Sequence, residues 1–480
     1  MKIKPKISEI LQEFIETQNL FQLKNLHEGV VHVGFPQEIQ KNIKKIQVTF
    51  GEMGVELKLY LAHKATKNQA FVKQALKCSI GIDVASKNEL ISALSCGFTG
   101  DKIEATGPKN NDFLQLALFH GCLISLDSIQ ELERLVEIYR KLNLEKQVNI
   151  LIRINNPNII GRNINVKDSR FGSNKESLGN FYEFIKQYNF LNFKGLHFHA
   201  DGYDPSMRAG ILEDLINILQ QSFEQGFSPE IINLGGALRE QTLENYPNWS
   251  NYLEELENKL LSNQKLPTWG NHSYGLFVNE KGKIGGKDKA LSRIYKSTFD
   301  TDLETTLEFE NQEGRVLANI LTENMFNIAL EPGYAILQQS GISLVKIIGT
   351  KTASDGSNLL LVDANLYNLG LAKMFQYITD PILISKNKNT ATDTVSNSNY
   401  LALVVGNLCR EDDFLIDREC FFDTKPQPGD LLVFTNTAPY FAGFEDASPI
   451  MHPTSKFLVA YKQAADWQIS TPENYNPFEN

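Results

Sequence analysis

The sequence predicts an α/β protein: a (β/α)8 TIM barrel followed by a C-terminal all-β domain. Between about residues 45 and 335, eight short apolar segments alternate with amphipathic helical patterns, as expected of parallel strands buried on both faces. Polar residues gather at the C-terminal ends of these segments, where a TIM barrel carries its chemistry. After residue 336, strand patterns follow one another with little helix between them. A doubly wound sheet is the alternative, and the positions of the polar residues favour the barrel.

The eight apolar segments are the candidate barrel strands. They are residues 57–63, 78–85, 102–107, 122–128, 148–155, 193–200, 230–236 and 327–333. The clearest helix lies between the fourth and fifth of them, at 128–142. It begins with Ser128 and Glu131 in a capping-box pattern, and an apolar stripe follows at helical spacing.

Three parts are predicted along the chain. Residues 1–44 form an N-terminal segment that packs on the β domain, residues 45–335 form the barrel, and residues 336–480 form a β-sandwich or β-barrel domain. The barrel contains an insertion at about 245–320, and a connection of this length suggests a lid or a dimer element. The polar, turn-rich stretch 385–400 is expected to be a surface loop.

Composition and charge exclude several classes of protein. A hydrophobic fraction of 42% and a net charge of −10 are typical of a soluble globular protein and argue against a nucleic-acid surface, which needs a basic patch. No window approaches the roughly 18 consecutive apolar residues of a membrane span, and the N-terminus lacks the apolar core of a signal peptide. The five cysteines are widely spaced without a CxxC pair, so neither a disulfide framework nor a metal site is expected. We expect a cytoplasmic protein.

Lys64, in the stretch YLAHKATKN (60–68), ends the first candidate strand. Most lysines lie in solvent, so a loop lysine just past a strand is the simplest interpretation. The alternative is an amine held at a strand end for covalent chemistry. An amine in a partly dry pocket has a lowered pKa and can attack a carbonyl group.

The order of motifs resembles the fold type III pyridoxal-phosphate-dependent decarboxylases, the family of ornithine, arginine and diaminopimelate decarboxylases. The matching stretches, from about residue 45 to 460, include HKATKN, IDVASKNEL, TGPKN, SRFG, GLHFHADGY, NLGGA, EPGY, VDAN, GNLCREDD and NTAPY. One such motif is weak, but this many in one order is a strong signal. The resemblance implies an alanine racemase-like barrel, pyridoxal 5'-phosphate as cofactor, a carboxy-lyase activity on an amino acid, and a homodimer with shared active sites.

The resemblance also implies roles for five residues of the barrel. Lys64 is the lysine that forms a Schiff base with the cofactor, and Asp83 lies near it. Glu331 bonds the pyridine nitrogen and keeps the ring protonated, so that the ring accepts electrons. His199 stacks on the ring. Arg153 buttresses the cofactor site, and a structural salt bridge is the alternative for it.

Four further residues are assigned by the resemblance to the phosphate and to proton transfer. Gly235 and Gly236 fall where the family has its phosphate loop, and glycine lets backbone N–H groups approach a phosphate closely. Tyr440, from the second domain, also reaches the phosphate. Cys409 is placed by a partner subunit at the active site and helps protonate the product. The alternative for Tyr440 is a core tyrosine, and the alternative for Cys409 is a buried structural thiol.

The substrate side departs from the family pattern. Asp363 and Tyr367 fall where the family has substrate-binding residues, with weaker matching. Tyr334 replaces the usual arginine after EPG, so a positive charge is missing or comes from elsewhere. Arg410 replaces the acid that directly follows the cysteine in enzymes acting on basic amino acids. If Arg410 faces the substrate, the distal end is anionic, since guanidinium pairs with carboxylate; if the loop shifts by one, Glu411 restores the familiar preference.

These departures suggest a divergent branch and leave three readings. The leading one is a decarboxylase of an L-amino acid or an amino-acid conjugate, with a diamino-acid-like or carboxylated substrate, as in siderophore or other specialised metabolism. A racemase is the second, and Glu331 argues against it because alanine racemases keep an arginine at the pyridine nitrogen. A catalytically silent paralogue that binds the cofactor is the third, given Tyr334 and Arg410.

Overall fold

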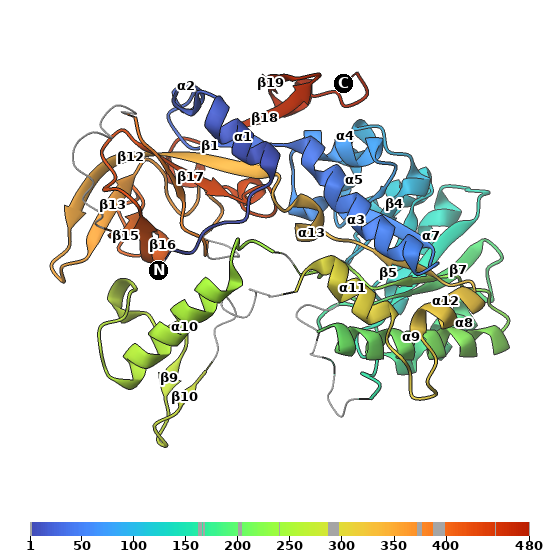
Figure 1. Cartoon of the computed structure of the whole chain (residues 1–480). Helices are drawn as coiled ribbons and strands as arrows, with labels where there is room; N and C mark the ends of the chain where they lie inside the picture. The colour runs from blue at the N-terminus through green and yellow to red at the C-terminus, as the bar shows by residue number, and fades with distance from the viewer. Residues whose placement is uncertain are drawn as a thin grey trace. The chain divides into compact units, whose positions relative to one another are not determined.

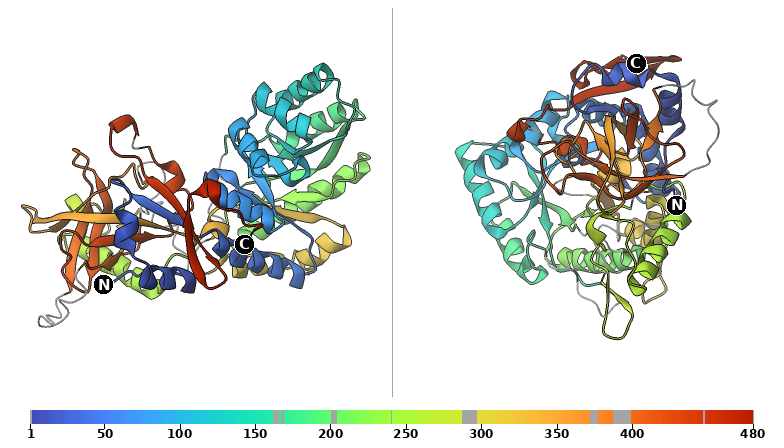
Figure 2. Two further views of the ribbon diagram at one scale, coloured as in Figure 1. Left: turned by 90° about the horizontal axis from the view of Figure 1, so that it is seen from above. Right: turned by 90° about the vertical axis from the view of Figure 1, so that its left-hand side faces the viewer.

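The computed structural model of the chain describes residues 2–161, 166, 169–199, 204–239, 241–286, 297–371, 377–386, 399–446 and 448–479. These residues form two compact units, which we name by their main architecture. The barrel unit comprises residues 39–239, 297–336 and 476–480. The β unit comprises residues 1–38, 240–296 and 337–475. Each unit is drawn in Figures 1 and 2.

Eight parallel strands close the barrel in the order β11-β2-β3-β4-β5-β6-β7-β8, which confirms the predicted fold. They are β2 (Leu57–Ala62), β3 (Gly81–Val84), β4 (Ile103–Ala105), β5 (Leu123–Leu126), β6 (Val148–Arg153), β7 (Leu191–His197), β8 (Ile231–Asn233) and β11 (Asn327–Leu330). Each lies within one of the predicted apolar segments or overlaps it, because both faces of such a strand are covered.

Helices lie outside these strands, as the labels α4, α5, α7 and α8 show in Figure 1. The helices of the barrel unit are α3 (Ile39–Glu52), α4 (Gln69–Lys77), α5 (Lys87–Ser95), α6 (Asn111–His120), α7 (Ile129–Lys141), α8 (Leu178–Ile185), α9 (Pro205–Glu224), α11 (Phe299–Leu307), α12 (Leu317–Glu323) and α13 (Tyr334–Leu337), whose last residue belongs to the β unit. No helix among the described residues combines the length and the apolar character that crossing a membrane requires.

The start of α7 fixes the loop that follows β4. As predicted, Ser128 caps the helix, with its Oγ accepting the Glu131 N–H at 3.2 Å. The Glu131 carboxylate does not close the expected box on Ser128. It accepts instead from the N–H groups of Asp127 (2.9 Å) and Lys109 (2.6 Å), and Lys109 Nζ lies 3.1 Å from it. The fully buried lysine draws this carboxylate away from the cap and ties the β4 loop to α7.

Side chains inside the barrel form an apolar layer below a polar one. The apolar layer consists of Tyr60, Leu123, Leu151, Ile231 and Ala329. Because strand side chains alternate, the residues two positions later point to the same face. Four of these later residues are polar, namely Ser125, Arg153, Asn233 and Glu331, and all four are buried. The polar layer therefore lies at the C-terminal end of the barrel.

The β unit is built from both ends of the chain. Its described strands are β1 (Val31–Gly34), β12 (Gly341–Thr352), β13 (Asn358–Val362), β14 (Ile382–Ile384), β15 (Tyr400–Val405), β16 (Phe414–Phe422), β17 (Leu431–Thr435), β18 (Lys456–Gln463) and β19 (Asp466–Ser470). β1 lies between β12 and β18, blue beside orange and red in Figure 2. The helices α1 (Glu9–Thr17) and α2 (Leu20–Lys24) share one apolar core with these strands.

The insertion contributes to both units. Its first part holds α10 (Tyr246–Leu261) and the hairpin of β9 (Phe277–Val278) and β10 (Ile284–Gly285), and belongs to the β unit. Tyr274 OH donates to Asp417 Oδ1 on β16 at 2.7 Å, which holds this part against the sheet. α11 and α12 belong to the barrel unit. Residues 287–296 of the insertion, and 387–398 of the expected loop at 385–400, lie outside the described residues.

Gly195, in β7, is required by the closeness of β8. Its φ is +149°, and a Cβ at this position would lie 1.8 Å from the carbonyl oxygen of Ile231. We expect Gly195→Ala to lower the free energy of unfolding by about 3 kcal/mol or more, because the clash is with backbone that cannot move aside. Chemical denaturation of the purified proteins measures this change.

The matched control is Gly179→Ala in α8, where nothing lies within 4 Å of the added methyl group. This variant should be as stable as the wild type or about 0.5–1 kcal/mol more stable. Equal stability of Gly195→Ala and Gly179→Ala would contradict the close strand approach.

Candidate active site

Lys64 and Asp83 lie on neighbouring strands at the C-terminal end of the barrel. Lys64 is in the 3-10 turn η2 (His63–Ala65) directly after β2, and its side chain is exposed. Asp83 on β3 is paired in register with Ala62, and its Oδ1 accepts from Thr106 Oγ1 at 2.5 Å. Burial raises the pKa of Asp83 to about 6, and the positive charge of Lys64 opposes this shift. The two side chains are therefore close enough to interact electrostatically.

Glu331 directly follows β11 and is buried. Its Oε1 accepts from Asn233 Nδ2 at 2.6 Å, and His197 Nε2 lies 3.5 Å from the same oxygen. Burial, together with the negative charge of Asp83, raises the pKa of Glu331 to about 8, while Lys64 acts in the opposite direction. The Glu331 carboxyl group thus changes its protonation state near neutral pH.

Two histidines complete the cluster around Glu331. His197, the last residue of β7, is buried, with Nδ1 2.7 Å from Ser125 Oγ. His199 accepts the Gly236 N–H at 3.2 Å. Burial, helped by neighbouring cations, lowers the pKa of both imidazoles well below the usual value, so both are neutral. One nitrogen of each ring and one Glu331 oxygen lie within 4.8 Å of one another.

The glycines after β8 permit close packing inside the site. Gly235 has φ +68°, and a Cβ there would lie 2.3 Å from His199 Nδ1; a Cβ on Gly236 would lie 1.9 Å from the carbonyl oxygen of Glu331. The Gly235 N–H donates to Asn233 Oδ1 at 2.7 Å. The structure thus brings this loop to His199 and Glu331, and phosphate binding by its N–H groups stays a prediction.

Arg153 ends β6, in the same polar layer. Its guanidinium lies over the ring of Phe171, 4.7 Å from the centroid, in the stretch SRFG. Burial lowers the pKa of Arg153, although the charges of Glu331, Asp127 and Asp83 oppose the shift. The guanidinium is therefore close enough to interact electrostatically with the acidic groups of the site.

Four functional candidates were missed at the sequence level. They are Glu104, Thr106, Arg208 and Asn233. Glu104 interrupts an apolar segment, which was a usable signal for a buried acid. Asn233 lies two residues before the glycine pair, and the sequence analysis did not predict a role for it. Arg208 lies on α9, and its Nη2 donates to the Ala237 carbonyl at 2.6 Å, a contact that no sequence pattern announces.

The remaining predicted residues belong to other parts of the chain. Tyr334 opens α13 in the barrel unit, whereas Tyr440, Cys409, Arg410, Glu411, Asp363 and Tyr367 belong to the β unit. Arg410 Nη1 donates to Tyr367 OH at 3.0 Å, and its Nε donates to Asp412 Oδ1 at 2.9 Å. Cys409, Arg410 and Glu411 are exposed. Asp363 lies 3.4 Å from Lys24 Nζ. The structure therefore groups Arg410 with Tyr367.

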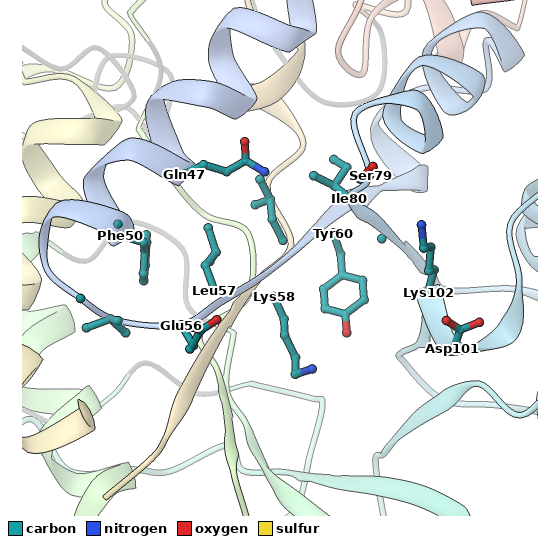
Figure 3. A pocket seen from close by; sticks show the side chains of 15 residues that line it. Gln47, Phe50, Glu56, Leu57, Lys58, Tyr60, Ser79, Ile80, Asp101 and Lys102 are labelled. Carbon is teal, nitrogen blue, oxygen red and sulfur yellow. The ribbon is translucent and has the colours of Figure 1, made fainter. Parts of the chain in front are cut away.

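A pocket of about 520 Å³ opens at the other end of the barrel. It is lined by the starts of β2 and β3 and by the turn before β4, and Figure 3 shows Lys58, Tyr60 and Lys102 along it. In TIM barrels the N-terminal face serves stability, and chemistry sits at the C-terminal face. The candidate active site is therefore the group of residues around Lys64 and Glu331 and not this pocket.

Comparison with known proteins shows what this chain is similar to. The family model of the pyridoxal-dependent decarboxylases, pyridoxal binding domain, matches residues 37–268. The uncharacterised protein y4yA of Sinorhizobium fredii is 27% identical over 88% of this chain and 85% of its own length. L-glutamyl-[BtrI acyl-carrier protein] decarboxylase of Niallia circulans is 28% identical over 38% of this chain and 44% of its own length. The crystal structure of diaminopimelate decarboxylase from M. jannaschii has the same fold, with a TM-score of 0.68 and 18% identity over 98% of this chain and 96% of that one.

Glu331 makes the stability of the cofactor-free protein depend on pH. A carboxyl group whose pKa is higher in the folded than in the unfolded chain favours folding at low pH, and this contribution is lost as pH rises from about 5 to about 8. We expect the melting temperature of the wild type to fall across this window relative to that of Glu331→Gln. Differential scanning fluorimetry of both cofactor-free proteins measures the difference.

Glu308→Gln, at an exposed position after α11, is the matched control and should follow the wild type at every pH. A constant difference between the wild type and Glu331→Gln would show that Glu331 titrates as an ordinary acid.

Proposed function

We propose that this chain, which belongs to the pyridoxal-phosphate-dependent decarboxylases, removes the α-carboxyl group of an L-amino acid or of an amino-acid conjugate. Pyridoxal 5'-phosphate, when bound, withdraws electrons from the substrate Cα, so that the bond to the carboxyl group can break. The observation that carries the proposal is that Lys64 and the buried acid Glu331 follow the neighbouring strands β2 and β11, at the C-terminal end of the barrel.

The residues of the barrel fit this cofactor. We assign to Lys64 the covalent bond to the cofactor aldehyde and to Glu331 the hydrogen bond to the pyridine nitrogen. Asn233 supports Glu331, because its amide donates to Oε1 at 2.6 Å. His199, held by the N–H of Gly236, offers a neutral ring face for stacking. The glycines let the loop after β8 approach these groups closely, because a side chain at either position would clash with His199 or with the Glu331 backbone.

Arg208 is our candidate for the missing positive charge near the phosphate. The family's arginine after EPG is Tyr334 in this chain. Arg208 is buried, and its guanidinium donates to the Ala237 carbonyl in the loop that the family uses for phosphate. Its charge also lowers the pKa of His199. A buried guanidinium at this loop would pair with a phosphate group.

The substrate that we favour carries a carboxylate or a conjugated group at its distal end. Arg410 donates to Tyr367 and Asp412, so its guanidinium is held in place on an exposed loop. A relative in Niallia circulans is named as a decarboxylase of an L-glutamyl acyl-carrier protein. We further propose a homodimer in which Cys409 and Arg410 reach the active site of the partner, with Cys409 returning a proton to the product. The diamino-acid alternative would use Glu411. The cytoplasmic location stays a prediction.

Lys64→Ala should abolish the visible absorbance of the bound cofactor and the release of carbon dioxide. The purified protein is titrated with pyridoxal phosphate, its spectrum is recorded, and release is assayed over a panel of amino acids and carboxylated conjugates. Lys67→Ala, an exposed lysine three residues later, is the matched control and should keep both properties. A band without release from any substrate would favour the racemase or the silent paralogue. No band in the wild type would sink the proposed function.

Arg410→Gln should raise KM for the preferred carboxylated substrate about tenfold to a hundredfold, the value of a hydrogen-bonded ion pair lost at a binding site. Glu411→Gln is its neighbour and control, and it should change KM little. Steady-state carbon dioxide release measures both variants. The reverse pattern, with Glu411→Gln impaired on a diamino acid, would replace the anionic substrate class by a cationic one.

A further inference from the structure

Glu104 is a second buried acid that shares one amide with Glu331. It lies on β4 with a side chain that is fully inaccessible to solvent. Its Oε1 accepts from Asn233 Nδ2 at 2.8 Å, and the same nitrogen donates to Glu331 Oε1 at 2.6 Å. The two hydrogens of one amide group are thus directed at two carboxyl groups. The third contact of Asn233 is its Oδ1, which accepts the Gly235 N–H.

The charges that face Glu104 come from several strands. Glu331 follows β11, Asp83 lies on β3, and both are acidic. Tyr60 on β2 lies near enough that Glu104 acts on its hydroxyl. Lys109, after β4, is a cation that acts on Glu104, and it is already bonded to Glu131 and to two carbonyl groups. Glu104 therefore faces mostly negative groups.

The surroundings of the second oxygen of Glu104 indicate the protonation state of this carboxyl group. Oε2 is buried and has no hydrogen-bond partner among the described residues. An ionised carboxylate with one oxygen unsatisfied in a dry interior is far more costly than a neutral acid. Burial, with the charges of Glu331 and Asp83, raises the pKa of Glu104 well above its usual value. Three carboxyl groups this close cannot all be ionised at neutral pH.

We propose that Glu104 is held as the neutral acid and acts as a positioning residue: it fixes the Asn233 amide, which in turn aims Glu331 at the ring nitrogen of the cofactor. Without an acceptor at Glu104, the amide of Asn233 would lose one of the contacts that define its orientation. With an ionised Glu104, repulsion would drive a proton onto Glu331. A neutral Glu104 leaves Glu331 as the group that pairs with the pyridine nitrogen. The positioning role rests on the proposed cofactor, whereas the neutral state of Glu104 does not.

The neutral state is tested on the cofactor-free protein by infrared spectroscopy. At pH 7 Glu331, with a pKa of about 8, also keeps its proton, so the contribution of Glu104 is isolated as the difference between the spectra of the wild type and Glu104→Gln. We expect this difference to contain the C=O stretching band of a buried carboxylic acid. Identical spectra of the two proteins in this region would overturn the neutral assignment.

The positioning role is tested by cofactor affinity. Glu104→Gln keeps a neutral oxygen acceptor for Asn233, and its Kd for pyridoxal phosphate should stay within about threefold of the wild type. Glu104→Leu removes the acceptor at similar volume, and its Kd should rise about tenfold or more. Circular dichroism and thermal unfolding serve to check that both variants fold. Asn233→Leu is a second variant that removes the contacts linking Glu104 to Glu331.

Two results would overturn the role. If Glu104→Leu and Asn233→Leu both bind pyridoxal phosphate with wild-type affinity, the contacts of Glu104 and Asn233 are not needed to orient Glu331. Equal weakening by Glu104→Gln and Glu104→Leu would show that the carboxyl proton, and not the acceptor, is required. If the wild type binds no pyridoxal phosphate, the proposed function and the positioning role fail together, while the infrared band still decides the state of Glu104.

Discussion

Desolvation of the carboxyl groups inside the barrel is the constraint on which the site depends. Asp83, Glu104 and Glu331 are all buried, and burial is the largest cause of the raised pKa of each. Opposing charges from Lys64 and Arg153 reach Asp83 and Glu331. The pKa of Asp83 is about 6 and that of Glu331 is about 8, while the pKa of Glu104 lies well above its usual value.

Much of the fold could be predicted because parallel strands covered on both faces leave a continuous apolar signature. The same logic placed Lys64 and Glu331 at strand ends. Strands β1, β14, β16 and β19 were not predicted, and two of them show why. β1 has four residues, and β16 is interrupted by charged residues, among them Arg418, which is buried and pairs with Asp380 at 2.8 Å. From the sequence alone, the charged residues of a buried ion pair look like residues of an exposed surface.

The support of the site could not be predicted to the same degree. The position of Glu104 within an apolar segment signals an unusual residue, but not which partner it meets across the barrel. Its bond to Asn233 joins β4 to β8, strands that are not neighbours in the sheet. Arg208 is likewise defined by where α9 lies beside the loop after β8. Contacts across a closed barrel are set by its geometry, and local patterns carry no information about them.

The apolar layer beneath the site explains why these groups stay dry. Tyr60, Leu123, Leu151, Ile231 and Ala329 fill the barrel one step below the polar layer. The pocket at the N-terminal end reaches the start of this layer, since Tyr60 lines it, and the buried acids begin beyond it. Water in that pocket therefore meets the Tyr60 ring before it reaches the buried carboxyl groups of the site. A smaller residue at position 60 would let water come closer to the buried carboxyl groups. Their desolvation would then be weaker, and their pKa values would return toward the usual values.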